Sequence, residues 1–391
     1  CGNIFYNNLL DLSMRMKKIL FATCCIAFLS GSLGAAAQKK SAAKNVLTQT
    51  LKGKSWSADN GNGTFTNPLF YDEFSDPDII RVGEDYYLAG TTMHSVPGLV
   101  VLHSKDLVNW EFSSYCFDRF DDSDDFNLRN GKEAYGQGIW APAIRYHNGK
   151  FYIFSNINGH GLQVYISDSA KGPWTHHKVN GDIYDLSVLF DEDGKIYAVH
   201  KYGNVTVTEL KPDLSGPVEG SSKVVIPEGN AMGEGHHVYK INGMYYILSA
   251  DYSPMGRMQC ARSKSIWGPY ETCVISERES YGYAAGWSVG NMGIGRPLPE
   301  DGFKFQNNKP NGLNLGCATI HQGGIVQAPD GKWWGVSMQD FNAVGRTVCL
   351  SPITWVDGWP YFGLEKNLGR SPRTWFKPND MVKTPQAPYD R

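Results

Sequence analysis

The chain has 391 residues, a formal net charge of -2 and a sequence pI near 6.6. This balance gives no chain-wide basic surface of the kind that neutralises many phosphates, which argues against nucleic acid as a partner. The 13% aromatic content and the 43 glycines are typical of many short strands and turns, and the length allows one large all-β domain or two ordinary domains.

The N-terminal region has the pattern of a secretory signal. Two lysines follow Met16, an apolar stretch runs over residues 19–29, and small residues lead up to Ala37. We therefore expect residues 1–37 to be an upstream extension plus a signal peptide that starts at Met14 or Met16 and is cleaved near Ala37. The apolar stretch is too short to span a bilayer comfortably. The sequence thus predicts a secreted or periplasmic protein with no membrane span after signal removal.

An imperfect repeat follows, made of an apolar strand, a Gly-containing turn and an aromatic-rich strand. It occurs five times, at residues 79–87, 143–152, 188–197, 237–246 and 325–334. Four of the turns hold Asn-Gly or Asp-Gly pairs, which are strong hairpin signals. A weaker echo with a further strand follows several repeats, at 104–110, 167–174 and 263–270. The sequence of each unit therefore predicts two hairpins.

Two hairpins per unit make a four-stranded blade, and five such units predict an all-β fold, a five-bladed β-propeller. A β-sandwich would also show many short strands, but not the same hairpin signature five times. We assign the propeller to residues 67–363, after an N-terminal lead-in at 38–66 and before a Pro-containing C-terminal linker at 364–391. A Gly- and Asn-rich insertion at about 277–316 is a candidate site-shaping loop.

The candidate chemistry lies just before the first strand of each blade. Because the first strands line the axis, these positions converge at one end of the central channel. They supply three carboxylates, one indole and one imidazole: Asp76, Asp185, Glu234, Trp140 and His321. Hydrolysis of a glycosidic bond needs one protonated carboxylic acid and one ionised carboxylate, and like charges in a small pocket raise at least one pKa. Trp140 offers a flat face for a sugar ring.

Each of these residues also has a purely structural interpretation. A single Asp before a strand is more often a turn-forming residue than a catalyst, and a lone histidine is more often a core residue than a ligand. The structural interpretation is weaker for three carboxylates together. The sequence therefore favours a catalytic group over three unrelated turn residues.

Five cysteines follow the predicted signal: Cys116, Cys260, Cys273, Cys317 and Cys349. They form no CxxC pair and no zinc-ligand spacing, and a large core needs no disulfide. We expect buried free thiols, with a bridge between Cys260 and Cys273 as the alternative.

Short motifs are spread over residues 67–363. They are Asn67-Pro68, Asp76-Pro77, Arg81-Val82-Gly83, Trp140-Ala141-Pro142, Asp185 ahead of Phe190-Asp191-Glu192-Asp193-Gly194, Glu234-Gly235 with His237, Arg262-Ser263-Lys264, His321-Gln322-Gly323-Gly324 and Gly345-Arg346. Together they resemble the motifs of glycoside hydrolase family 43, five-bladed propellers that include β-xylosidases, α-L-arabinofuranosidases and arabinanases.

The resemblance implies an inverting mechanism with three named roles. Asp76 would be the general base that deprotonates water, and Glu234 would be the general acid that protonates the departing sugar oxygen. Asp185 would raise the pKa of Glu234 and orient it. Asp78 lies two residues from Asp76, but the Asp-Pro pattern favours Asp76 as the base.

The resemblance also implies residues around the terminal sugar. Trp140, Arg346, His321, Gln322 and Met93 would contact the substrate. No cofactor would be required, although His321 matches a histidine at the propeller centre that often sits beside a cation, often calcium. Met93 stands where related xylosidases commonly carry Phe. The residue therefore leaves open whether the released sugar is xylose or arabinose. Position 236 is His where the family often has Pro, so we expect a local difference in the backbone.

We therefore expect an exo-acting, inverting glycoside hydrolase that releases terminal α-L-arabinofuranosyl or β-D-xylosyl groups from plant cell-wall polysaccharides or oligosaccharides. The resemblance places arabinofuranosidase ahead of xylosidase. The alternatives are a non-catalytic carbohydrate-binding propeller and an endo-arabinanase of the same family. Members with the closing segment at 350–360 usually continue into a β-sandwich domain, to which the C-terminal linker would lead.

Overall fold

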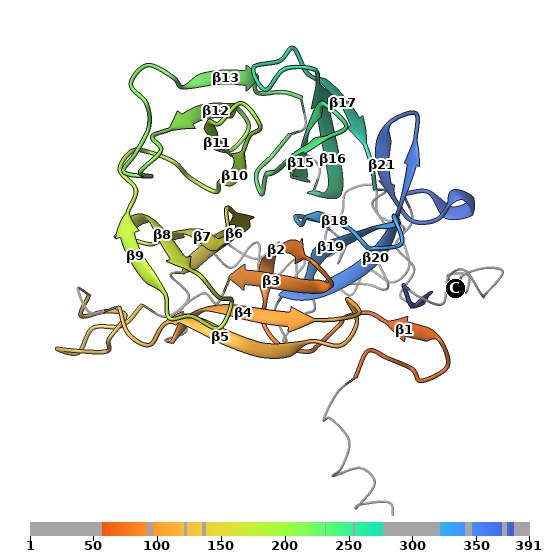
Figure 1. The fold of residues 1–391 in the computed structure, drawn as a ribbon, viewed down its shortest axis with the longest axis horizontal. Coiled ribbons are helices and arrows are strands. Elements are labelled where there is room, and N and C mark those ends of the chain that lie inside the picture. The colour runs from red at the N-terminus through yellow and green to blue at the C-terminus, as the bar shows by residue number, and fades with distance from the viewer. Residues whose placement is uncertain are drawn as a thin grey trace, which may run out of the picture. The chain divides into compact units, whose positions relative to one another are not determined.

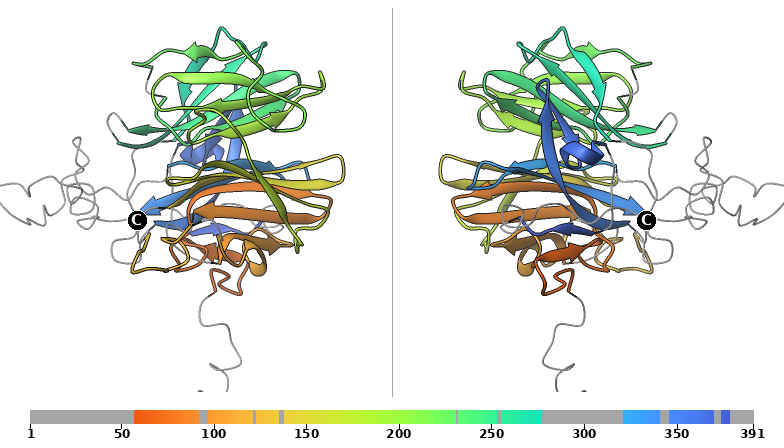
Figure 2. Two further views of the ribbon diagram at one scale, coloured as in Figure 1. Left: turned by 90° about the vertical axis from the view of Figure 1, so that its left-hand side faces the viewer. Right: turned by 90° about the vertical axis from the view of Figure 1, so that its right-hand side faces the viewer.

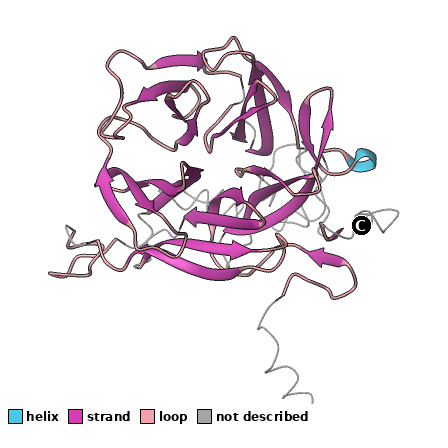
Figure 3. Cartoon of the chain, viewed as in Figure 1, coloured by secondary structure: helices cyan, strands magenta, loops and turns pink. Residues whose placement is uncertain are grey.

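The repeated hairpins form five four-stranded antiparallel sheets, arranged as blades around a central axis (Figure 1). The structure is a computed structural model and describes residues 57–91, 97–120, 123–134, 138–230, 232–252, 255–276, 321–340, 346–369 and 374–378. Nearly all of their regular structure is strand, and the helix among them is a single 3-10 turn, η2 (Glu365–Asn367) (Figure 3). The prediction of an all-β, five-bladed propeller is confirmed.

In every blade the four strands follow one another in chain order. Blade 1 consists of β2 (Ser75–Val82), β3 (Asp85–Thr91), β4 (Gly98–Ser104) and β5 (Glu111–Phe117), and blade 2 of β6 (Ile139–His147), β7 (Lys150–Ile157), β8 (Gly161–Ser167) and β9 (Thr175–Lys178). Blade 3 consists of β10 (Ser187–Phe190), β11 (Ile196–His200), β12 (Val205–Leu210) and β13 (Lys223–Ile226). Blade 4 consists of β14 (His237–Ile241), β15 (Met244–Tyr252), β16 (Met255–Ser263) and β17 (Glu271–Val274), and blade 5 of β18 (Ile325–Gln327), β19 (Trp333–Asp340), β20 (Arg346–Val356) and β21 (Trp359–Phe362).

Local turn chemistry explains the inner hairpins. Asn148 and Gly149 join β6 to β7 with φ angles of 48° and 79°, and Asn242 and Gly243 join β14 to β15 with 52° and 77°. Two-residue hairpin loops with positive φ at both positions match the twist of the flanking strands, and Asn-Gly adopts them at low cost. The hairpin signals of the sequence therefore mark the turns correctly.

Five apolar clusters hold the blades together, and each lies between two neighbouring blades. The cluster between blades 5 and 1 also contains Phe65 and Trp375, both fully buried. These residues oppose each other where β1 (Thr64–Thr66) pairs with β22 (Thr374–Phe376). Blades 5 and 1 lie side by side in both side views (Figure 2). Part of the predicted linker thus completes a core between the first and last blades.

The same backbone feature begins every blade. One residue has a positive φ, and we call it the pivot residue: Asp76 (52°), Ala141 (29°), Asp185 (52°), Gly235 (67°) and Gln322 (45°). Such angles are uncommon outside glycine, so their recurrence aligns the five blades residue by residue. The residues just before the pivots are Ser75, Trp140, Tyr184, Glu234 and His321.

A buried polar network lies just after the pivots, two to four residues further along the chain. Asp78 forms ion pairs with Arg145 and with Nδ1 of His237, the latter at 3.1 Å, and its Oδ2 accepts the Ile144 N–H at 2.9 Å. Arg145 donates to Ser187 Oγ at 2.6 Å. Burial acts to raise the pKa of Asp78, but the charges of Arg145 and His237 outweigh it and hold that pKa below its ordinary value. Asp78 therefore joins blades 1, 2 and 4, and both of its carboxyl oxygens have partners in this network.

Two further features concern the predictions about a membrane span and about the state of the cysteines. Among the residues that the structure describes, no helix is long and apolar enough to cross a membrane. Cys116, Cys260, Cys273 and Cys349 are free thiols, although Cys260 and Cys273 face each other across β16 and β17. Residues 1–37, the insertion at 277–316 and Cys317 lie outside the described residues.

Candidate active site

The fold brings the three predicted carboxylates together at one end of the axis. Asp76 and Asp185 are the pivots of blades 1 and 3, whereas Glu234 precedes the pivot of blade 4. Asp185 Oδ2 accepts the Gly235 N–H at 2.7 Å, which ties it to the backbone beside Glu234. The charges of Glu234 and Asp76 both reach Asp185 strongly enough to raise its pKa. The three side chains thus share one electrostatic site.

Asp76 is buried, its carboxylate contacts residues of blades 1 and 5, and blade 2 contacts its partner Thr91. Thr91 Oγ1 donates to Asp76 Oδ2 at 2.5 Å and accepts the Ala141 N–H at 2.8 Å. Arg346, the first residue of β20, places Nη1 3.7 Å from Asp76 Oδ1. Sequence reasoning missed Thr91; the one signal for it was its place at the end of the strand that pairs with the Asp76 segment.

Asp185 and Glu234 differ in their surroundings. Asp185 is 6% exposed, and burial first, then the charges of Glu234 and Asp76, raise its pKa. Glu234 is half-buried, and burial together with the charge of Asp76 raises its pKa against the effects of Tyr184 and Arg346. Carboxyls that repel in a poorly hydrated site compete for a proton. The site therefore favours a state in which one of the two carboxyls is protonated and the other ionised.

Tyr184 was not singled out by the sequence, yet its side chain contacts the predicted acid. Its hydroxyl donates to Glu234 Oε2 at 2.9 Å. Burial and the charges of Glu234 and Asp185 raise the pKa of Tyr184, which keeps the phenol protonated as a donor. Its position before Asp185 could have suggested that it lies in the site, but not that it contacts Glu234.

The predicted sugar-binding residues lie at the same end of the blades where the structure describes them. Trp140 is half-buried, and its indole lies directly against Gly138, where a Cβ would lie 2.0 Å from Trp140 Cε2. Gln322 is buried against Gly235, where a Cβ would lie 2.3 Å from Gln322 Cγ. Both close approaches require glycine. Met93 lies outside the described residues.

Two histidines next to the site are buried. The backbone of His321 pairs with Met338 of β19. His236 donates from Nε2 to the Lys201 carbonyl at 2.6 Å and accepts from Ser249 Oγ at 2.5 Å, and burial lowers its pKa to about 4. Within the described residues, no three His, Cys, Asp or Glu side chains gather to hold a metal ion. Calcium at the propeller centre stays a prediction, and the chemistry below uses none.

Comparison with known proteins connects this geometry to a family. Residues 65–282 match the sequence model of Glycosyl hydrolases family 43. The chain belongs to this family. It is 32% identical over 347 residues to a putative beta-xylosidase of Xylanibacter ruminicola, covering 85% of this chain and 57% of that protein. It is 34% identical over 316 residues to a non-reducing end alpha-L-arabinofuranosidase of Bacteroides ovatus, covering 77% and 54%.

Solved structures agree with this family 43 membership. A bifunctional GH43-CE protein of Bacteroides eggerthii superposes with a TM-score of 0.65 at 33% identity, over 80% of this chain and 37% of that one. The chain spans a little over half the length of the curated relatives described here. The likeness therefore concerns the propeller of the family 43 proteins.

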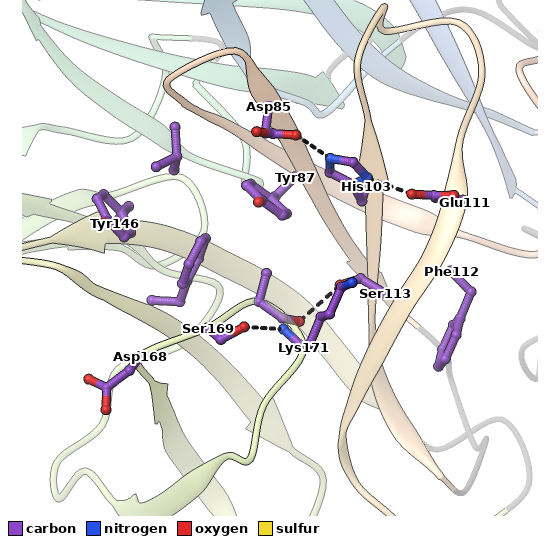
Figure 4. A pocket seen from close by; sticks show the side chains of 13 residues that line it. Asp85, Tyr87, His103, Glu111, Phe112, Ser113, Tyr146, Asp168, Ser169 and Lys171 are labelled. Carbon is purple, nitrogen blue, oxygen red and sulfur yellow. Dashed lines mark hydrogen bonds and ion pairs between the residues drawn. The ribbon is translucent and has the colours of Figure 1, made fainter.

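A pocket in this family 43 propeller lies away from the carboxylates. It has a volume of about 570 Å³ and opens between blades 1 and 2 (Figure 4). Val82 in its lining ends β2, whereas Asp76 lies near the start of that strand. Several of its charged groups form ion pairs: Asp85 contacts His103 Nε2 at 2.5 Å and Lys105 Nζ at 2.6 Å, and Asp168 pairs with Lys150. None of the residues predicted for catalysis lines it.

Proposed function

We propose that the protein is an exo-acting, inverting glycosidase that releases terminal α-L-arabinofuranosyl or β-D-xylosyl groups from plant cell-wall polysaccharides or their oligosaccharides. The observation that carries this proposal is the meeting of Asp76, Asp185 and Glu234 from three blades beside Trp140 and Arg346. Relatives named as xylosidases and arabinofuranosidases support the pentose. The signal pattern at residues 14–37 supports export of the protein.

Asp76 is the base of the proposed reaction. The hydrogen bond from Thr91 to Oδ2 orients the carboxylate, and the positive charge of Arg346 lies near Oδ1. Asp76 accepts a proton from a water molecule as the water oxygen attacks the anomeric carbon. Attack from the face opposite to the leaving oxygen inverts the configuration.

Glu234 is the acid, and it carries the proton for which it competes with Asp185. Asp185 accepts the Gly235 N–H, which favours its ionised form, whereas Glu234 is half-buried and open to substrate. The proton of Glu234 goes to the glycosidic oxygen as the bond from that oxygen to the anomeric carbon breaks. The two carboxyls repel, which by itself raises the pKa of Asp185; in the proposed division of roles Asp185 is ionised, favours the protonated form of Glu234 and holds the backbone beside it.

Replacement of Asp185 by asparagine tests this division of roles. Removing the negative charge removes the repulsion that favours protonated Glu234, so the pKa of Glu234 should fall. The basic limb of the pH profile of kcat/KM should therefore move to lower pH, because activity requires protonated Glu234. A basic limb that stays in place would mean that Asp185, not Glu234, holds the shared proton.

Assays of the wild type test the function itself. We expect hydrolysis of nitrophenyl α-L-arabinofuranoside or nitrophenyl β-D-xyloside, and proton NMR of the first-formed sugar should show the anomer opposite to that of the substrate. The Asp76→Ala variant, purified in parallel, controls for contaminating glycosidases. Equal activity in both proteins would reject the assignment, and a retained anomer would reject water activation by Asp76. Cleavage of internal arabinan bonds alone would favour an endo-arabinanase.

A further inference from the structure

The aligned blades place Tyr184 at the repeat position of two residues already assigned to the site. The residue before the pivot is Trp140 in blade 2, Tyr184 in blade 3 and Glu234 in blade 4. Blades 3 and 4 are neighbours, with an apolar cluster between them. Tyr184 keeps 46% of its surface exposed while its hydroxyl reaches Glu234 Oε2 at 2.9 Å. Its ring is thus open to solvent beside the proposed acid.

We propose that Tyr184 is a positioning residue for the general acid Glu234 and forms the wall against which the leaving group of the substrate lies. This inference rests on the proposed function, since it takes Glu234 as the group that protonates the departing sugar. It assigns to Tyr184 one task for the hydroxyl and another for the ring, and the two tasks can be separated by substitution.

The hydroxyl acts on the carboxyl of Glu234. It donates to Oε2, which leaves Oε1 as the oxygen that carries the transferable proton. As this proton passes to the glycosidic oxygen and the glycosidic bond breaks, Glu234 becomes a carboxylate. A donor already in place stabilises the charge that develops, without reorganisation during the reaction. Tyr184 therefore favours the transition state over the protonated ground state.

The groups that face Glu234 determine in which direction its pKa shifts when the Tyr184 hydroxyl is removed. They are Tyr184, Asp185, Asp76 and Arg346. Burial raises the pKa of Glu234, the hydrogen bond from Tyr184 lowers it, the charge of Asp76 raises it, and that of Arg346 lowers it. Loss of the Tyr184 hydroxyl should raise the pKa of Glu234 further. Glu234 would then stay protonated to higher pH but would be a weaker acid.

The ring acts on the leaving group. The carboxyl that protonates the glycosidic oxygen must lie on the side of the departing sugar, and the Tyr184 hydroxyl contacts this same carboxyl. The exposed aromatic ring therefore lies beside the place that the first sugar of the leaving group would occupy. Aromatic rings bury apolar sugar faces while their hydroxyls stay hydrogen-bonded. We infer a contact with an oligosaccharide leaving group that a small aryl leaving group lacks.

Two substitutions with a matched control separate these tasks. Tyr184→Phe removes the hydroxyl, Tyr184→Leu also removes the ring, and Tyr146→Phe alters an exposed tyrosine at the opposite ends of the strands. For pentosyl oligosaccharides, Tyr184→Phe should lower kcat by about tenfold, the effect of one hydrogen bond to a charged group, and shift the basic limb to higher pH. For dinitrophenyl pentosides, whose leaving group needs little protonation, the loss should be about twofold or less.

Tyr184→Leu should in addition raise KM for oligosaccharides more than for dinitrophenyl pentosides, and Tyr146→Phe should match the wild type. Equal losses with both leaving groups, together with an unmoved basic limb, would show a merely structural role and overturn the proposal.

A measurement without substrate makes the outcome independent of activity. Carboxyl ¹³C NMR titration of glutamate-labelled protein, with the Glu234 signal assigned by its absence in Glu234→Gln, should give a higher pKa for Glu234 in Tyr184→Phe than in the wild type. An unchanged pKa would overturn the positioning role, whether or not the protein is active. If the pKa of Glu234 rises in Tyr184→Phe while the wild type hydrolyses no pentoside, the contact is upheld and the proposed function is rejected.

Discussion

Replacing Glu234 by alanine is expected to make the rate depend strongly on the leaving group. General acid catalysis contributes about 10²- to 10⁴-fold, and we expect a loss of this order in kcat/KM for pentosyl oligosaccharides. A dinitrophenolate departs without protonation, so the same variant should lose much less activity on dinitrophenyl pentosides. Steady-state kinetics over a series of aryl pentosides and one oligosaccharide would measure this dependence.

Asp76→Ala should behave differently from Glu234→Ala. Water must be activated whichever group departs, so its loss should be similar for all leaving groups and again about 10²-fold or more. Glu192→Ala is the control, because Glu192 lies in the turn between β10 and β11 at the far end of the strands and its side chain is 84% exposed. Two variants with the same leaving-group dependence would contradict the assignment of base to Asp76 and acid to Glu234.

Among the substitutions proposed for this protein, Asp78→Ala is expected to cause the largest loss of stability. The substitution leaves the Arg145 side chain, which is only 12% exposed, without its carboxylate, and removal of one partner of a buried ion pair costs about 3–5 kcal/mol in the free energy of unfolding. Because Asp78 also binds His237 and the Ile144 N–H, blades 1, 2 and 4 lose a shared contact. Urea unfolding followed by tryptophan fluorescence measures the change.

The exposed pair between Lys150 and Asp168 provides the control for this prediction. Asp168 is 82% exposed on its side chain, so Asp168→Ala should change the free energy of unfolding by about 1 kcal/mol or less. If Asp78→Ala were no more destabilising than Asp168→Ala, the buried network would not be what joins the blades at the axis.

Local patterns in the sequence were enough to predict the blades. Asn148-Gly149 and Asn242-Gly243 mark inner hairpins because their backbone angles suit two-residue turns, a preference that acts over a few residues. Their repetition predicted five blades, and the convergence of the first strands predicted that Asp76, Asp185 and Glu234 meet. The proposed roles of these carboxylates came from the family resemblance, because residue types alone do not distinguish acid from base.

The contacts between blades could not be derived in this way. Tyr184 reaches Glu234 across 50 positions of sequence, and Asp78 reaches His237 across 159. The repeat predicted that Glu234 stands directly before a strand, but the backbone places it one residue before the pivot, whereas Asp76 and Asp185 are pivots themselves. A one-residue offset changes the direction of a side chain, and no local propensity specifies it.

The sequence by itself therefore determined the number of blades and the set of carboxylates, because short-range turn preferences and a repeat of hairpins encode them. Only the tertiary structure decided which groups hold these carboxylates. The Gly235 N–H on Asp185 and the Tyr184 hydroxyl on Glu234 depend on how blades pack against one another, whereas Thr91 reaches Asp76 through the pairing of β2 with β3 inside blade 1. Such packing joins residues far apart in the chain, so the charge on each carboxylate depends on neighbours that no short motif contains.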